Sequence, residues 1–392
     1  MELLNAPIFP NSVNPFAARI RHVLALVVAS ASSLWAQTSL PPFLELRVPK
    51  PPTVATAEHG SFLAYELHVT NFAAQTMTLQ RIEVVTASGE SRVLLAITDS
   101  MLRRALTRPG TTLPSPERAK LAGGSRAVVF LWVPVDRGSP PGSLGHRVTI
   151  ERGSADSLRT EDLEGATVPV LREAATIGPP LRGGPWLTGN GPAAEAGHRR
   201  ALVPVAGTPA IAQRFAIDFV KVGDDYLTFS GDRLKNTSYY AYGNAALAVA
   251  DGMVVAVKDG IPENIPGPAS RAVPITLETV GGNHVIVDIG GGRYAFYAHL
   301  QPGSLRVRLG DRVRKGQVVG LVGNSGNSTE PHLHFHVSDG TSPLGSEGLP
   351  YGYDSFEIVG HCRTFNTGCE RVAPVVRRGE MPLGNVLIQF SR

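Results

Sequence analysis

Apolar and polar residues alternate in short runs along most of the chain, which predicts a protein built mainly of β-strands. The run FLAYELHV at residues 62–69 places Leu63, Tyr65, Leu67 and Val69 at every second position, so these side chains share one face of a strand. Further strand candidates in this half are RIEVV, RAVVFLWVPV, HRVTI and ATVPVL. Short strands at such spacing are typical of two packed antiparallel sheets, and we expect an immunoglobulin-like β-sandwich over residues 41–171.

A second β-rich region follows a segment that differs in composition. Residues 172–197 are dense in Gly and Pro and are expected to form a linker. From residue 198 to residue 392 the strand candidates are ALAVADGMVVAV, HVIVDI, YAFYAHL, QVVGLVG and HLHFHV, separated by Gly-containing turns. Helical patterns are short, as in SMLRRAL at residues 100–106. The predicted fold class is therefore all-β, with two domains.

The N-terminus has the pattern of a secretory signal. Arg19 and Arg21 precede an apolar stretch, residues 22–36, that ends in small residues and is too short to span a membrane. We expect residues 1–36 to be a signal peptide, so that the protein is secreted into the periplasm or the extracellular space. An uncleaved anchor is the alternative.

Composition excludes several classes of function. The chain has 392 residues and a formal net charge of +4 without a run of Lys or Arg, so no nucleic-acid partner is expected. Its two cysteines, Cys362 and Cys369, are too few for a cysteine-rich zinc site. In an exported protein a pair this close in sequence predicts a disulfide.

Histidines and one aspartate form the candidate chemistry. In PHLHFHV the alternating positions place His332, His334 and His336 on one face of a strand. His299 ends the apolar run YAFYAHL, and Asp218 lies in the apolar run QRFAIDF, where a carboxylate is costly unless it is paired or bound to a metal. Imidazoles and one carboxylate on converging strands fit a catalytic zinc site with three protein ligands.

At these motifs the sequence resembles the lysostaphin-type (LytM-like) zinc metallopeptidases, most of which cut peptide cross-links in bacterial peptidoglycan. The matching stretches are YGNAALAVADGMVVAV, GNHVIVDIGGGRYAFYAHL, GDRVRKGQVVGLVGNSG and PHLHFHV, within residues 197–337. The resemblance implies a β-sheet groove over residues 198–392 with Zn²⁺ at its floor and a peptidoglycan peptide as substrate. It also implies that Asp218 and His334 bind zinc and that His332 and His299 are the catalytic imidazoles.

One position departs from the family pattern, which has His-x-Gly-x-Asp at the first ligand pair. Here Arg214 stands where the histidine is expected, and an arginine does not bind zinc. We expect His198 to replace it, brought opposite residues 216–217 by a hairpin that turns at residues 206–208. The predicted ligands are thus His198, Asp218 and His334, with Arg214 at the groove edge facing a substrate carboxylate.

Parts of the sequence are compatible with two other functions. A biotinyl- or lipoyl-type carrier domain has similar turns, but Lys315 is in the wrong place to carry the prosthetic group and the histidines would be unexplained. A metal-free relative that binds peptidoglycan or activates a cell-wall amidase is the stronger alternative, because Arg214 replaces a ligand. The sandwich is expected to be a spacer, a chaperoning domain or a binding domain for cell-envelope proteins. His336 is expected in the groove wall or in contact with a ligand, and no role is assigned to His59, His68, His146, His284 and His361.

Overall fold

The computed structural model describes residues 43–153, 156–172, 174–268 and 271–391, and nearly all regular structure in them is β-strand. This confirms the predicted all-β fold class. The predicted signal peptide, residues 1–36, lies outside the described residues. Within the described residues no helix has both the length and the apolarity that crossing a bilayer requires.

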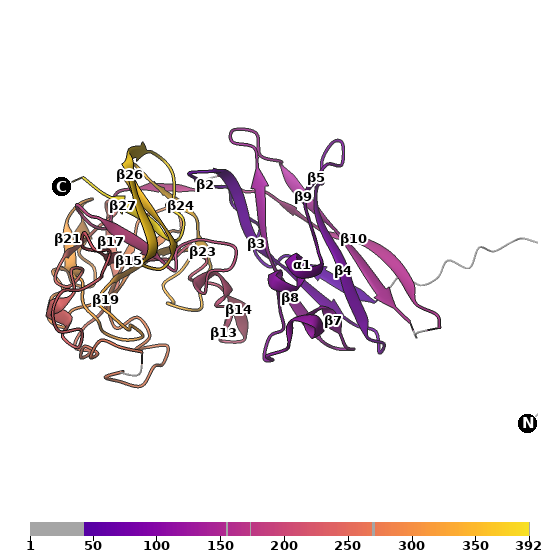
Figure 1. Ribbon diagram of the computed structural model, residues 1–392, viewed down its shortest axis with the longest axis horizontal. Coiled ribbons are helices and arrows are strands. Elements are labelled where there is room, and N and C mark those ends of the chain that lie inside the picture. The colour runs from indigo at the N-terminus through magenta and orange to yellow at the C-terminus, as the bar shows by residue number, and fades with distance from the viewer. Residues whose placement is uncertain (1–42, 154–155, 173, 269–270, 392) are drawn as a thin grey trace, which may run out of the picture. The chain divides into compact units, whose positions relative to one another are not determined.

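The first half is a sandwich of two antiparallel sheets (Figure 1). One sheet contains β1 (Leu44–Arg47), β2 (Ala55–Ala57), β3 (Gly60–Asn71), β6 (Leu106–Thr107) and β8 (Arg126–Val135). The other contains β4 (Met77–Thr86), β5 (Val93–Thr98), β7 (Lys120–Leu121), β9 (Ser143–Arg152) and β10 (Arg159–Pro169). A short helix, α1 (Asp99–Ala105), and a 3-10 turn, η1 (Ser115–Ala119), connect strands, and α1 matches the helical pattern at residues 100–106. The immunoglobulin-like relationship of this sandwich stays a prediction.

Strand β3 is buried on both faces, and its sequence shows why. Leu63 and Leu67 point into the core between the two sheets, together with Val129 of β8 and Val148 of β9. Phe62, from the opposite face, belongs to the core of the second half of the chain. A strand that is covered on both sides has few polar residues, and FLAYELHV has only Glu66 and His68.

The second half is organised around an antiparallel sheet of eleven strands. In spatial order its strands are β20 (Arg312–Val313), β17 (Gly252–Lys258), β18 (Asn283–Asp288), β19 (Tyr294–Leu300), β22 (Leu333–Ser338), β15 (Ile217–Lys221), β12 (Trp186–Gly189), β27 (Val386–Gln389), β25 (Phe356–Thr364) and β26 (Thr367–Arg377), and β23 (Gly348–Leu349) pairs with β22. Smaller ladders are β11 (Ala175–Ile177) with β24 (Tyr351–Tyr353), β13 (Val203–Val205) with β14 (Thr208–Ala210), and β16 (Ala245–Leu247) with β21 (Val318–Leu321). Two 3-10 turns are η2 (His198–Arg200) and η3 (Asn236–Ser238).

The segment expected to be a linker, residues 172–197, contains the strands β11 and β12. Strand β12 lies between β15 and β27 in the large sheet, and Trp186 is fully buried there. The Gly and Pro content of the segment hid this short apolar strand. The disulfide prediction is confirmed, since Cys362 and Cys369 are bonded across β25 and β26.

Candidate metal site

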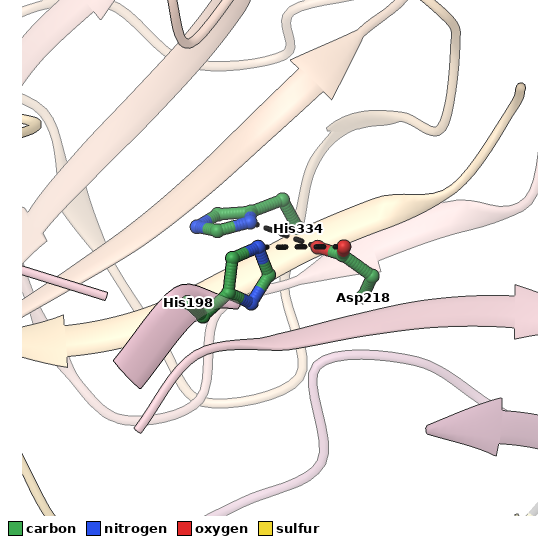
Figure 2. Close-up of side chains that lie close together, drawn as sticks. All are labelled: His198, Asp218 and His334. Atoms are coloured by element: carbon green, nitrogen blue, oxygen red, sulfur yellow. Dashed lines mark hydrogen bonds and ion pairs between the residues drawn. The ribbon is translucent and has the colours of Figure 1, made fainter. Parts of the chain in front are cut away.

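Neighbouring strands bring the carboxylate and one histidine together. Asp218 on β15 is the direct register partner of His334 on β22. Side chains at directly opposed positions of antiparallel strands lie on the same face, about 4.5–5.5 Å apart at Cβ. The result is a contact of 2.9 Å between Nδ1 of His334 and Oδ1 of Asp218 (Figure 2).

A second imidazole fixes the orientation of His334. Its Nε2 is 3.0 Å from Nδ1 of His336, and both rings are buried. Nδ1 of His334 donates to the ionised carboxylate of Asp218, and Nε2 accepts from Nδ1 of His336. A metal bound at Nδ1 would displace that proton and leave Nε2 to donate to His336, since the second nitrogen of a metal-binding histidine normally donates to a fixed acceptor. The contact agrees with the expectation of His336 in the groove wall or next to a ligand.

His198 completes the cluster from outside the sheet. Its Nε2 lies 3.5 Å from Oδ2 of Asp218, whereas His334 contacts Oδ1 (Figure 2). The rings of His198 and His334 have centroids 4.9 Å apart and are nearly perpendicular. Potential ligand atoms of His198, Asp218 and His334 all lie within 4.8 Å of one another.

His198 is positioned by a different element from the one expected. The hairpin with its turn at residues 206–207 exists, but it pairs only Val203–Val205 with Thr208–Ala210. Successive turns at residues 211–216 follow it, so it does not continue to β15. His198 therefore does not face residues 216–217 across a ladder and is carried instead by the 3-10 turn η2.

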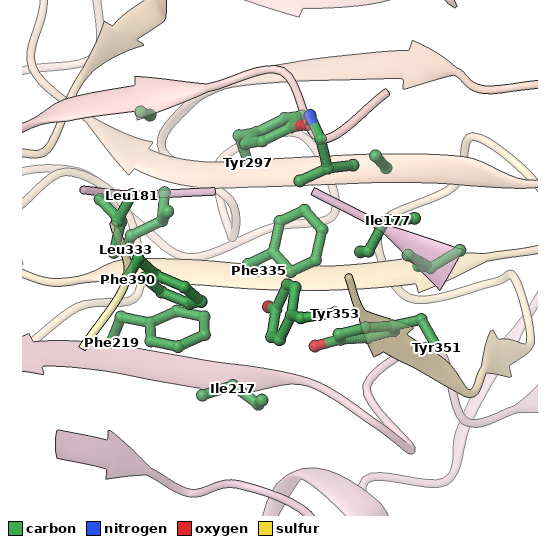
Figure 3. Packing of buried hydrophobic residues seen from close by; sticks show 14 of the residues in the cluster. Ile177, Leu181, Ile217, Phe219, Tyr297, Leu333, Phe335, Tyr351, Tyr353 and Phe390 are labelled. Atoms are coloured by element: carbon green, nitrogen blue, oxygen red, sulfur yellow. Dashed lines mark hydrogen bonds between the residues drawn. The ribbon is translucent and has the colours of Figure 1, made fainter. Parts of the chain in front are cut away.

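The opposite face of the same strands forms an aromatic core. Phe219 and Phe335 alternate with Asp218 and His334 along β15 and β22, so they point away from the cluster into the core shown in Figure 3. Phe335 packs against Tyr297 of β19, with ring centroids 5.2 Å apart. Burial of each such ring contributes about 1.5–3 kcal/mol. The candidate site therefore rests on a well-packed floor.

His299 and His332 lie beside the cluster, and both have Nδ1 bonded to a backbone carbonyl. Nδ1 of His299 donates to the carbonyl of Ser325 at 2.8 Å, and Nδ1 of His332 donates to that of Glu330 at 2.8 Å. Their ring centroids are 4.8 Å apart. Nε2 of each ring is therefore unprotonated when the ring is neutral. The Nε2 atom of His332 lies 3.4 Å from Oδ1 of Asp218.

Burial and charge set the protonation states of the group. Burial raises the pKa of Asp218, but the neighbouring histidines, His198 and His332 foremost, outweigh burial and hold that pKa well below its usual range. Burial lowers the pKa of His198 to about 4 and that of His299 well below its usual value. Near pH 7 Asp218 is therefore ionised and His198 is neutral, which are the forms that bind metals, and His299 is neutral as well. Burial lowers the pKa of His332, but the neighbouring Asp218 outweighs burial and raises that pKa above its usual value.

Two cavities meet at the cluster. One, of about 280 Å³, is lined by His198, His299 and His334, and the other, of about 500 Å³, by Gly189 and Glu330. Asp218 and His332 line both. The cluster is thus reached from two sides, as an extended chain lying in a groove would require.

Arg214 does not face this groove, which corrects the expectation that it would meet a substrate carboxylate. Its side chain is buried and paired with Glu66 of β3 at 2.5 Å and with Glu347 at 2.6 Å. A buried guanidinium needs such partners, and here they draw it away from Asp218. The position of the expected family histidine is therefore part of the packing against the sandwich.

Asn190 is a site residue that sequence reasoning missed. Its Nδ2 donates to Oδ2 of Asp218 at 2.8 Å, from the end of β12. It lay in the expected linker, and only the apolar residues before it, Trp186 and Leu187, indicated a strand. Asn283 and Asn324 are structural, since they bond to neighbouring loops, while Asn327 lines the smaller cavity.

Part of the chain is similar to known peptidases. Residues 237–345 match the family model described as Peptidase family M23. Glycyl-glycine endopeptidase ALE-1 of Staphylococcus capitis is 45% identical over 56 residues, which are 14% of this chain and 15% of that protein. Peptidoglycan DD-endopeptidase ShyA of Vibrio cholerae is 39% identical over 56 residues, 14% of this chain and 13% of that protein.

Among solved structures, the catalytic domain of lysostaphin from Staphylococcus simulans is 19% identical, with a TM-score of 0.22, covering 44% of this chain and 88% of that one. The chain spans about 15% of the length of the first curated relatives that it matches. His299, His332 and His334 lie inside the family match, and His198 and Asp218 precede it. The predicted resemblance to the lysostaphin-type peptidases is confirmed, and it includes residues 237–345, which match the M23 family model.

Proposed function

We propose that this protein is an exported zinc metalloendopeptidase that hydrolyses the peptide cross-links of peptidoglycan. The observation that carries the proposal is the cluster of His198, Asp218 and His334 beside His299 and His332 in a groove. The M23 match and the similarity to the endopeptidase ALE-1 support a peptidase, and the similarity to the peptidoglycan DD-endopeptidase ShyA supports peptidoglycan as its substrate. The signal-like residues 1–36 support export, to a compartment where that substrate is found.

The donor set fits zinc. Two imidazole nitrogens and one carboxylate oxygen are typical zinc ligands. With one ligand atom taken from each of His198, Asp218 and His334, the three atoms lie within 4.8 Å of one another, so the group is compact enough to hold one ion. Nε2 of His334 is bonded to His336, so Nδ1, which faces Asp218, is the nitrogen that would bind the ion. Three protein ligands leave a position for water, as in catalytic rather than structural zinc sites.

The roles of the other residues follow from their free nitrogens. Bound zinc would lower the pKa of a water molecule toward neutrality and polarise the scissile carbonyl. His332 and His299 are each fixed through Nδ1, so in the neutral ring Nε2 is the nitrogen that can take a proton. One imidazole takes the proton of the attacking water and passes it to the leaving amine. The imidazolium formed in that step stabilises the developing oxyanion.

A non-catalytic function is the second candidate. The observation that favours it is Arg214, which occupies the place of a family ligand. In that case the groove would bind peptidoglycan without cutting it, or the domain would activate a cell-wall amidase. The N-terminal sandwich would bind cell-envelope partner proteins under either function.

Digestion of purified sacculi tests the proposal. The full mature chain is incubated with sacculi, with and without a chelator, and released fragments are separated and weighed by mass spectrometry. We expect cross-linked peptides to be cut to uncross-linked ones with new amino termini, with loss of activity on chelation and recovery on adding zinc. His334→Ala should be inactive, and His361→Ala, an exposed histidine on β25, should match the wild type.

Two results would overturn this assignment. Zinc-loaded protein that leaves all peptide bonds intact, or that cuts only glycan bonds, would exclude the endopeptidase. Zinc-free protein that binds sacculi without cutting them would establish the non-catalytic function.

A further inference from the structure

The 3-10 turn that carries His198 is attached to the β-sandwich by the next residue. Arg199 is fully buried, at 0% exposure. Its guanidinium donates to the carbonyls of Leu131 on β8 and Tyr65 on β3, which are register partners. Another hydrogen bond, of 2.9 Å, reaches the carbonyl of Ala194 in the loop before the turn. One side chain thus connects this loop to two central strands of the sandwich.

Aromatic residues of β8 enclose the same guanidinium. Cζ of Arg199 lies 5.6 Å from the ring centroid of Trp132 and 5.8 Å from that of Phe130. Arg200 adds a second attachment: its Cζ is 5.3 Å from Phe130 and it donates to the carbonyl of Arg104 at 2.8 Å. The planar guanidinium can stack on rings and donate in several directions at once, which a lysine ammonium cannot.

These contacts matter because the segment around His198 contains no strand. Between the end of β12 at Gly189 and the start of β13 at Val203, the structure assigns η2 as the one regular element. No strand of the large sheet therefore fixes His198, in contrast to Asp218 and His334. A buried charge is costly when it loses its hydrogen bonds, so the three that Arg199 donates favour the turn in this position.

We propose that the β-sandwich is a working part of the metal site, because through Arg199 it holds His198 against Asp218. The inference rests on the proposed function, since it takes His198 as a ligand. Arg199 is a positioning residue: its contacts are Leu131, Tyr65, Ala194 and the rings of β8, and none is a group of the cluster. Without Arg199, η2 would no longer be held next to Asp218, and the site would keep only Asp218 and His334 as ligands.

Zinc affinity, measured on the full mature chain by competition with a chromophoric chelator, tests this inference. We expect Arg199→Met to weaken zinc binding about 10–100-fold, as loss of a residue supporting a ligand does. Arg199→Lys should fall between Arg199→Met and the wild type. Arg137→Met is the control, because Arg137 also joins the two halves of the chain, through Ala57 and Glu380, but contacts no residue of η2.

A double-mutant cycle separates positioning from general destabilisation. If Arg199 acts only through His198, then His198→Ala with Arg199→Met should bind zinc as weakly as His198→Ala alone. Additive losses would overturn the inference, as would wild-type affinity in Arg199→Met. If Arg199→Met does not fold, as judged by near-UV circular dichroism, Arg199→Lys decides in the same way. Wild-type protein that binds no zinc would instead overturn the proposed function, and the inference with it.

Discussion

Arg214 offers a sharp test of the packing between the sandwich and the groove. Arg214 and Glu66 each have side chains only 4% exposed, and Glu347, the second partner, is 18% exposed. Replacing Arg214 with Met would leave Glu66 as a buried carboxylate without its cation. Breaking a buried ion pair from one side costs about 3–5 kcal/mol. That is a large part of the 5–15 kcal/mol of stability of a typical domain, so the variant should be visibly less stable.

The assay is urea unfolding of the metal-free protein at pH 7, arranged as a cycle with Glu66→Gln. Most of the loss in Arg214→Met arises from the unpaired carboxylate, so adding Glu66→Gln should recover part of it. Glu347 is more exposed and is expected to be solvated once released. A loss below about 1 kcal/mol in Arg214→Met, the level of an exposed ion pair, would refute the reasoning. Strict additivity of the two substitutions would refute it as well.

Two further predictions concern histidines of different kinds. His334→Ala removes a ligand, so this variant should lose both zinc and activity. His332→Ala should keep most of its zinc, while its rate falls about 10²–10⁴-fold, as for a lost general base. Equal zinc loss in the two variants would show that the roles are misassigned. His146 is buried in the sandwich, and burial lowers its pKa to about 4. Because that pKa lies below the unfolded value of about 6.5, its contribution to stability, about 3 kcal/mol, is complete above pH 6.5 and is lost as the pH falls toward 4. His146→Gln should flatten the unfolding free energy over that range, and an unchanged slope would contradict this.

Local patterns were sufficient for many of the strands, though not for β12, and for half of the site. Alternation along FLAYELHV and PHLHFHV predicted β3 and β22, because a side-chain period of two specifies which face is buried. The same parity placed His332, His334 and His336 together, and the apolar run around Asp218 indicated a partnered carboxylate. Neighbouring strands then brought Asp218 opposite His334.

Long-range contacts account for what the sequence did not reveal. Arg214 pairs with Glu66, 148 residues away, so nothing near Arg214 indicated that it turns from the groove. His198 was expected on a strand, but Arg199 holds it in a 3-10 turn through carbonyls of Tyr65 and Leu131. Backbone carbonyls have no sequence signature, and such a contact can be seen only once the fold is known.

The most direct test of the account is the zinc content of three purified proteins: wild type, His198→Ala and Arg214→His. If His198, Asp218 and His334 are the ligands, wild-type protein should contain one zinc ion per chain, because each ligand contributes one donor atom to a single cluster. His198→Ala should lose that ion, and Arg214→His, where it folds, should gain none. Wild-type protein without zinc, with metal bound only in Arg214→His, would contradict the account and make the groove a binding site without catalysis.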